Sequence, residues 1–246
     1  PKFYLFGESL GSQVSEEMFR GTGISGPEGI SLDAALWIGT PASTVYRREL
    51  WGKRTVAEAP EVGPGSYYLP RAVRDWKALP DSEREKVSFL LLQNGDDPVP
   101  KFDPPLVWKR PDWLGPDDLR PPGAPLGTKW LPVVSFVTTF IDLQNALVPT
   151  PGFFQEGGHD YRREIPEAMS AVWGLSATDE QMQSVKEALR FRELQWEARR
   201  RWDKAESVPT PDRPAAEDKV IADVATWLGH DVTREELLEI VANDAV

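Results

Sequence analysis

The sequence predicts an α/β fold, in which a mostly parallel sheet is flanked by helices and followed by a C-terminal helical appendage. Three observations support this prediction. Short, continuous apolar runs have the length of strands, helical stretches separate them, and the sequence becomes charged and helical near residue 176. The chain has 246 residues, 40% of them hydrophobic and 27% charged, which is typical of a globular protein with a substantial core.

The predicted strands are short runs of apolar residues, each closed by turn residues. They cover residues 2–6, 34–38 and 87–92, and glycine, proline or aspartate follows each of them. Strands without polar alternation are buried on both faces, which is the situation in a parallel sheet covered by helices.

Two helices are predicted in the same part of the chain. Residues 12–19 place Val14, Met18 and Phe19 on one side, and a longer apolar helix runs to Leu147 from a start just after Pro132. Residues 98–128 are rich in proline and tryptophan and predict a long loop region, and residues 149–158 predict another loop.

The C-terminal part has a different character. Residues 176–206 predict a long charged helix that starts at a capping box formed by Thr178 and Gln181. Its expected apolar face consists of Met182, Val185, Leu189 and Trp196. These features separate a domain of residues 1–175 from the helix of residues 176–206.

Residues 207–214 have the composition of a linker, and residues 215–246 predict a small helical appendage attached by a hinge. Its first helix should end at Gly229, and its second should begin at a capping box formed by Thr233 and Glu236. Val232 and Leu237 are spaced for a hydrophobic staple at that second helix.

Composition excludes several classes of function. The formal net charge of −11 opposes nucleic-acid binding, which needs cations against phosphate. The absence of cysteine excludes disulfides and thiolate-bound metal, and two histidines are too few for most zinc sites. We therefore expect no metal and no cofactor.

The start of the chain is unusual. It begins at Pro1 without methionine, inside a predicted strand, and neither a signal peptide nor a transmembrane run is recognisable. We therefore expect that further sequence precedes residue 1 in the full-length protein.

The first candidate for chemistry is the pentapeptide Gly7-Glu-Ser-Leu-Gly11, a G-x-S-x-G motif. A strand before it and a helix after it are the context of a nucleophile elbow, in which Ser9 is exposed on a strained turn. Glycines two positions on either side would avoid collision with that turn. An ordinary glycine-rich turn is the alternative.

A serine hydroxyl needs a base, which is nearly always histidine in such sites. His159 lies in a loop far along the chain, whereas His230 follows the helix stop at Gly229 and is better placed to support a helix C-terminus. We therefore assign the base to His159.

The acid should lie between serine and histidine at the end of a strand. Asp96 and Asp97 follow the strand of residues 87–92, and both satisfy this condition. The order serine, aspartate, histidine is that of α/β-hydrolases. The alternative is that Asp96, Asp97 and Pro98 merely form a turn.

Two further groups have less specific interpretations. Trp108, Trp113 and Trp130 could line an acyl pocket, but packing within proline-rich loops is the simpler explanation. The run of arginines from Arg199 to Arg201 could contact a membrane surface, but a solvated helix face fits it better. The acidic residues that would balance this face are Glu193, Glu197 and Glu206.

Six segments together carry a family resemblance. They are Phe6-Gly-Glu-Ser-Leu-Gly-Ser12, Leu36-Trp-Ile-Gly-Thr-Pro41, Leu92-Gln-Asn-Gly-Asp-Asp-Pro-Val99, Val107-Trp-Lys-Arg-Pro-Asp-Trp-Leu114, Trp130-Leu-Pro-Val-Val-Ser-Phe136 and Gly158-His-Asp-Tyr161. With these segments, residues 1 to about 175 resemble the bacterial membrane-linked α/β-hydrolase family. The resemblance implies a partial α/β-hydrolase fold with the triad Ser9, Asp97 and His159, and it favours Asp97 over Asp96.

The resemblance also implies parts outside this chain. Family members carry a multi-spanning membrane region before the hydrolase domain, so the full-length protein is expected to be membrane-associated. The Leu10 backbone N–H is expected as one oxyanion donor, and the second donor is expected from an upstream loop.

The sequence thus predicts a serine hydrolase, esterase-like or lipase-like, acting on a small-molecule or lipid-like acyl substrate. Two alternatives stay open: an acyltransferase that uses the same triad, and a binding module that keeps the fold without catalysis.

Overall fold

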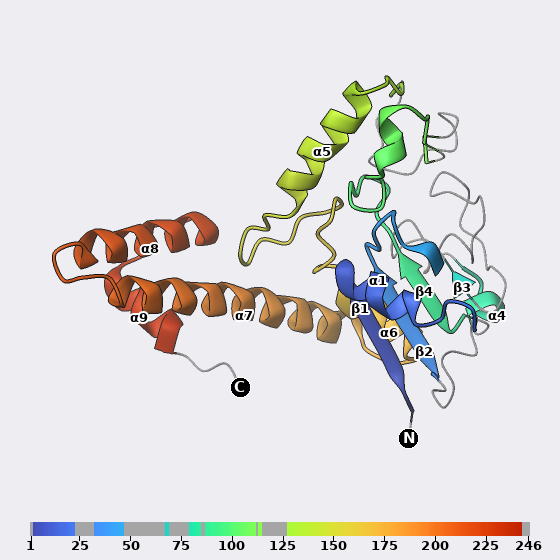
Figure 1. Ribbon diagram of the computed structural model, residues 1–246. Coiled ribbons are helices and arrows are strands. Elements are labelled where there is room, and N and C mark those ends of the chain that lie inside the picture. The colour runs from blue at the N-terminus through green and yellow to red at the C-terminus, as the bar shows by residue number, and fades with distance from the viewer. Residues whose placement is uncertain are drawn as a thin grey trace. The chain divides into compact units, whose positions relative to one another are not determined.

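The computed structural model describes residues 2–22, 32–46, 67–68, 79–84, 87–111, 113–114 and 127–242. The chain divides into two compact units (Figure 1). Unit 1 comprises Pro1–Val148 and Gln155–Ala177, and unit 2 comprises Pro149–Phe154 and Thr178–Val246.

Unit 1 is built on a parallel sheet. In the described residues its strands are β1 (Tyr4–Glu8), β2 (Ala34–Ile38), β4 (Phe89–Leu92) and the two-residue β3 (Tyr67–Tyr68), in the order β1-β2-β4-β3. Every neighbouring pair is parallel, which confirms the predicted fold class. The first strand lies two residues later than predicted, because its pairing with β2 continues to Glu8 opposite Ile38.

Both faces of the sheet are covered, as the continuous apolar strands predict. Alternate residues of β2 belong to two separate core clusters: Leu36 lies with Ala168 and Val172 on one face, and Trp37 lies with Phe19 on the other. The first face is covered by α6 (Ile165–Val172), which was not among the predicted helices, and the second by α1 (Leu10–Glu17) (Figure 1).

The orientation of α1 differs from the prediction. Val14 and Met18 are exposed, and only Phe19, just beyond the helix, is buried. The helix instead faces the sheet with polar side chains. Ser15 Oγ accepts a hydrogen bond of 2.9 Å from the Trp37 indole, and Ser12 Oγ lies 2.8 Å from Thr40 Oγ1. Hydrogen bonding, rather than an apolar stripe, therefore fixes this side of the helix.

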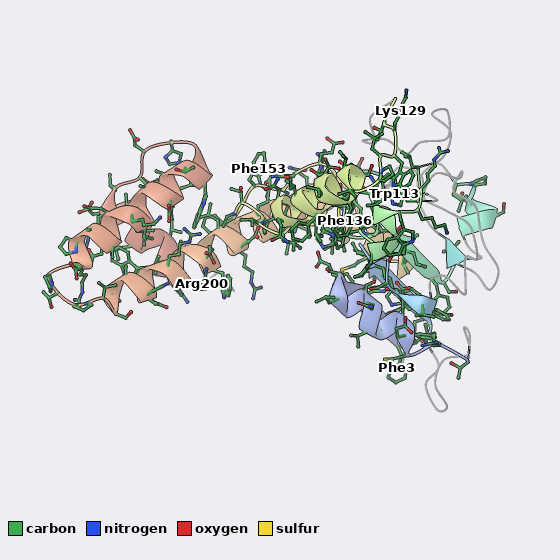
Figure 2. All side chains as sticks on the ribbon, turned by 45° about the horizontal axis from the view of Figure 1, so that its top comes forward. Phe3, Trp113, Lys129, Phe136, Phe153 and Arg200 are labelled. Atoms are coloured by element: carbon green, nitrogen blue, oxygen red, sulfur yellow. The ribbon has the colours of Figure 1, made fainter. Side chains whose placement is uncertain are left out.

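The loop region after β4 contains a short 3₁₀ helix, η3 (Pro104–Val107), and leads to α5 (Val134–Ala146). The predicted start after Pro132 is confirmed. Phe136 of α5, labelled in Figure 2, packs on Phe102 with ring centroids 5.0 Å apart. The remaining short helix in the described part of unit 1 is α4 (Asp81–Arg84).

Unit 2 contains α7 (Asp179–Glu206), α8 (Arg213–Leu228) and α9 (Arg234–Ala242). The capping box of Thr178 and Gln181 is confirmed, and Gly229 ends α8 in a left-handed conformation with φ 76°. At the start of α9, Thr233 Oγ1 accepts the Glu236 N–H at 3.1 Å.

The three helices share one core, which differs from the predicted hinged pair. Ala198, Trp202 and Ala205 of α7 pack with Val224 of α8 and Leu237 of α9. The predicted apolar face of α7 is wrong, because Val185, Leu189 and Trp196 are exposed. Helix α8 also begins at Arg213, within the segment predicted as a linker.

Candidate active site

Ser9 lies at the turn between β1 and α1. Its φ of 52° and ψ of −119° are unfavourable for a residue with a side chain. Its N–H donates to the Ile38 carbonyl at 2.8 Å, so the turn is tied to the end of β2. Its side chain makes no capping hydrogen bond to α1, so the start of the helix does not engage the hydroxyl.

The two glycines of the motif have different surroundings. A Cβ on Gly7 would lie 2.7 Å from Ser15 Oγ and 2.8 Å from the Ser12 Cα, because the first turn of α1 folds back over it. A Cβ on Gly11 would meet nothing within 4 Å. Crowding therefore explains Gly7, and the expectation that it also explains Gly11 is wrong.

Asp97 and His159 lie together at the carboxyl edge of the sheet. Asp97 follows β4, and its Oδ2 lies 2.9 Å from His159 Nδ1. The Asp97 side chain is fully buried and that of His159 is 9% exposed. A carboxylate only accepts hydrogen bonds, so Nδ1 carries the hydrogen and Nε2 is left as the basic nitrogen.

The charges around His159 change its basicity. Burial alone would lower the pKa of His159, but the hydrogen bond with Asp97 and the charges of Asp97, Glu8 and Asp160 outweigh it. The pKa of His159 is therefore raised above its ordinary value of 6.5. Partial desolvation likewise raises the pKa of Glu8, against the opposing effect of His159.

Ser9 and His159 both adjoin the end of β2. Ser9 is bonded to Ile38, and a Cβ on the next residue, Gly39, would lie 2.8 Å from His159 Cε1. Glu8, the neighbour of Ser9, is close enough to His159 to affect its pKa. Across the described residues, no hydrogen bond joins Ser9 Oγ to the imidazole. Such bonds are often long in the absence of substrate.

Asp96 has a larger role than the predicted turn. Its Oδ1 accepts the Gly158 N–H at 2.8 Å, and Asn94 Nδ2 donates to the Gly158 carbonyl at 3.1 Å. These two bonds attach the loop that carries His159 to the loop that carries Asp97.

Gly39 and Tyr161 also belong to the site, although no pattern in the sequence predicts their roles. Gly39 has φ 57°, and a Cβ there would collide with the rings of both His159 and Tyr161. The Tyr161 hydroxyl donates to Asp97 Oδ2 at 2.6 Å. Both residues stood within segments that carried the family resemblance, but only the spatial contacts reveal what they do.

Leu10 begins α1, so its N–H is among the first-turn donors that have no carbonyl partner within the helix. Trp113 and Trp130 each donate an indole N–H to a loop carbonyl, of Lys101 at 3.2 Å and of Leu106 at 2.9 Å. These bonds favour packing over an acyl pocket. Trp108 is exposed.

The remaining candidates lie in unit 2. His230 is exposed, and its Nδ1 lies 2.9 Å from the Asp231 carbonyl. Arg199 donates to the Val241 carbonyl, while Arg200 and Arg201 pair with Glu197. Of the acidic residues predicted to balance the arginine run, Glu197 therefore pairs with two of its members, which favours a solvated helix face over a membrane contact.

No group of three or more histidine or acidic side chains in the described ranges is arranged to hold a metal ion. None of the helices described combines the length and apolar character that crossing a membrane requires.

A serine on a strained strand-to-helix turn and a histidine–aspartate pair at the same edge of the sheet are typical of α/β-hydrolases. The model of the alpha/beta-hydrolase family matches residues 1–185, three quarters of the chain. The chain belongs to the α/β-hydrolase family. Comparison with curated proteins gave no match, and neither did comparison with solved structures.

Proposed function

We propose that this protein is a serine hydrolase that cleaves an ester or related acyl substrate, small or lipid-like, through Ser9, Asp97 and His159. The observation that carries the proposal is the 2.9 Å contact of His159 Nδ1 with Asp97 Oδ2, at the sheet edge where Ser9 adjoins β2. Membership of the α/β-hydrolase family supports a hydrolytic reaction.

The proposed reaction proceeds through an acyl-enzyme. Ser9 Oγ attacks the acyl carbon while His159 Nε2 takes the hydroxyl proton of Ser9. The histidine then gives this proton to the leaving group. Asp97 stabilises the imidazolium that forms in between. The Leu10 N–H and the N-terminus of α1 would stabilise the oxyanion. Water, activated by the same histidine, then releases the acid.

We also propose, from the family resemblance, that the full-length protein is associated with a membrane through an N-terminal region outside residues 1–246.

The test is covalent labelling of the full-length protein by a fluorophosphonate probe, with mass spectrometry to locate the modified residue. We expect the probe on Ser9, and no labelling of Ser9→Ala. His159→Ala should lose activity towards a short activated ester by on the order of 10⁴-fold or more, since base and nucleophile act as a unit. His230→Ala is the matched control and should retain activity. Failure of the wild-type protein to react with the probe would instead favour a non-catalytic binding module.

The two aspartates provide a sharper contrast. Asp97→Asn should lower kcat by roughly 10²–10⁴-fold, because it alters the tautomer of the histidine. Asp96→Asn keeps an oxygen that can accept the Gly158 N–H, so a change of only a few fold is expected. Asp96→Ala removes that oxygen and should cost about tenfold or more by displacing His159. A harmless Asp97→Asn together with a crippling Asp96→Asn would contradict the proposed acid.

A further inference from the structure

Tyr161 lies two residues after His159 and is fully buried in the core cluster between the sheet and α6. Its ring meets that of His159 edge to face, with centroids 5.8 Å apart. Its hydroxyl accepts the Asn94 N–H at 2.9 Å and donates to Asp97 Oδ2 at 2.6 Å. The hydroxyl is thus fixed at both its donor and its acceptor side.

The Asp97 oxygen that Tyr161 contacts is the same one that accepts from His159. Oδ2 therefore receives two donors, at 2.6 Å from Tyr161 and 2.9 Å from His159, while Oδ1 receives the Val99 N–H at 2.8 Å. A hydrogen bond donated to a carboxylate oxygen reduces its attraction for a second donor. The tyrosine hydroxyl and the imidazole thus compete for one buried oxygen.

We propose that Tyr161 is a positioning residue that sets the strength of the Asp97–His159 pair by sharing Oδ2. It acts on the reaction only through Asp97, and it keeps His159 from being held too firmly as the imidazolium. The proposal rests on the proposed roles of Asp97 and His159 in catalysis. Simple packing does not require the hydroxyl, because a phenylalanine ring would fill the same apolar space.

Among the described residues, the other charged groups that act on this pair or on Tyr161 are Glu8, Asp160, Asp96 and Lys101. Glu8 at the end of β1 and Asp160 next to His159 both raise the pKa of His159. The pKa of the Tyr161 hydroxyl is raised well above its usual 10.0. Burial is the largest cause, and the charge of Asp97 is the next largest. The hydroxyl therefore stays protonated, and stays a donor, through any neutral pH range.

The test is Tyr161→Phe in the full-length protein, with the His159 pKa followed by NMR. The His159 signal is identified by its loss in His159→Ala, and exposed His230 serves as an internal reference. Loss of the competing donor should raise the His159 pKa by about half a unit to one unit. The acid limb of kcat/KM should move to higher pH by the same amount. The matched control is Tyr46→Phe, a buried tyrosine in the core on the other face of the sheet, which should leave the His159 pKa unchanged.

A double-mutant cycle distinguishes the sharing of Asp97 Oδ2 by Tyr161 and His159 from general structural damage. In an Asp97→Asn background, Tyr161→Phe should no longer shift the His159 pKa. Should Tyr161→Phe fail to fold, 3,5-difluorotyrosine at position 161 keeps the ring, strengthens the donor and should shift the His159 pKa downward instead.

An unchanged or lowered His159 pKa in Tyr161→Phe would overturn the proposal, even if the melting temperature fell. The NMR titration requires no turnover, so its result is independent of the labelling of Ser9. A protein that shows the expected shift but no labelling would refute the proposed function and leave the coupling of Tyr161 to Asp97 intact.

Discussion

Glu8 occupies the first variable position of the G-x-S-x-G motif, next to Ser9, and its carboxylate is near enough to His159 to act on its pKa. The negative charge raises the pKa of His159, in addition to the larger effects of Asp97. Since the proposed base must be neutral, activity is expected to be lost as pH falls through this raised pKa, that is, beginning above the ordinary value of 6.5.

Glu8→Gln removes that charge and keeps the shape of the side chain. The His159 pKa should therefore fall by several tenths of a unit, and the acid limb of kcat/KM should move to lower pH. A pH–rate profile with a short activated ester measures this shift, with exposed Glu180→Gln of α7 as the control. An acid limb that stays in place would show that Glu8 is screened from His159 by solvent.

At the level of the elements, the turn between β1 and α1 contains two glycines whose replacement by alanine should affect stability differently. Gly7→Ala places a Cβ within 2.9 Å of Ser15 Oγ, the Ser12 Cα and the Gly11 carbonyl. Two of these atoms belong to the backbone and cannot be displaced without a large energetic cost. We therefore expect the free energy of unfolding to fall by about 1–3 kcal/mol.

Gly11→Ala is the matched substitution in open space at the start of α1. It should leave stability unchanged or raise it by up to about 1 kcal/mol, because alanine favours the helix over glycine. Urea denaturation of both variants measures the difference, and probe labelling of Gly11→Ala should persist. Equal destabilisation by the two changes would mean that the turn is packed differently.

The elements also show which parts of the fold the sequence could predict. Strands β2 and β4 are continuous apolar runs, and this pattern is sufficient to locate a buried parallel strand. The prediction placed the wrong side of α1 against the sheet. The side that faces the sheet carries Ser12 and Ser15, which are held by hydrogen bonds, so the sequence shows no apolar periodicity there. Helix α6 has eight residues, too few for a periodic signal.

The candidate site likewise contains some residues that the sequence could predict and others that it could not. Ser9, Asp97 and His159 could be selected from residue type, strand context and order along the chain. The role of Tyr161 depends on a hydroxyl meeting a carboxylate 64 positions away, and that of Gly39 on an imidazole packing over its Cα. Neither contact has a local sequence pattern, so neither could be predicted.

For the molecule as a whole, the side of the sheet at β1 is the notable surface. In the described residues β1 ends the strand order, and large apolar side chains are exposed on β1, on the adjoining α1 and at residues directly next to them. They are Phe3, Tyr4, Phe6, Leu10, Val14 and Met18. An exposed apolar strand edge promotes pairing with other chains. We therefore expect the isolated 246-residue chain to self-associate.

Lysines at this surface should reduce the self-association, since charge on an edge opposes strand pairing. Phe3→Lys combined with Val14→Lys should raise the monomeric fraction in size-exclusion chromatography with light scattering. The control is Val185→Lys combined with Leu189→Lys, which replaces two exposed apolar residues of α7 and changes the net charge equally. If both pairs help equally, the loss of exposed apolar side chains in general, rather than the β1 edge, governs association. A wild-type chain that is monomeric and melts cooperatively would contradict the prediction, because such an edge would then be harmless in solution.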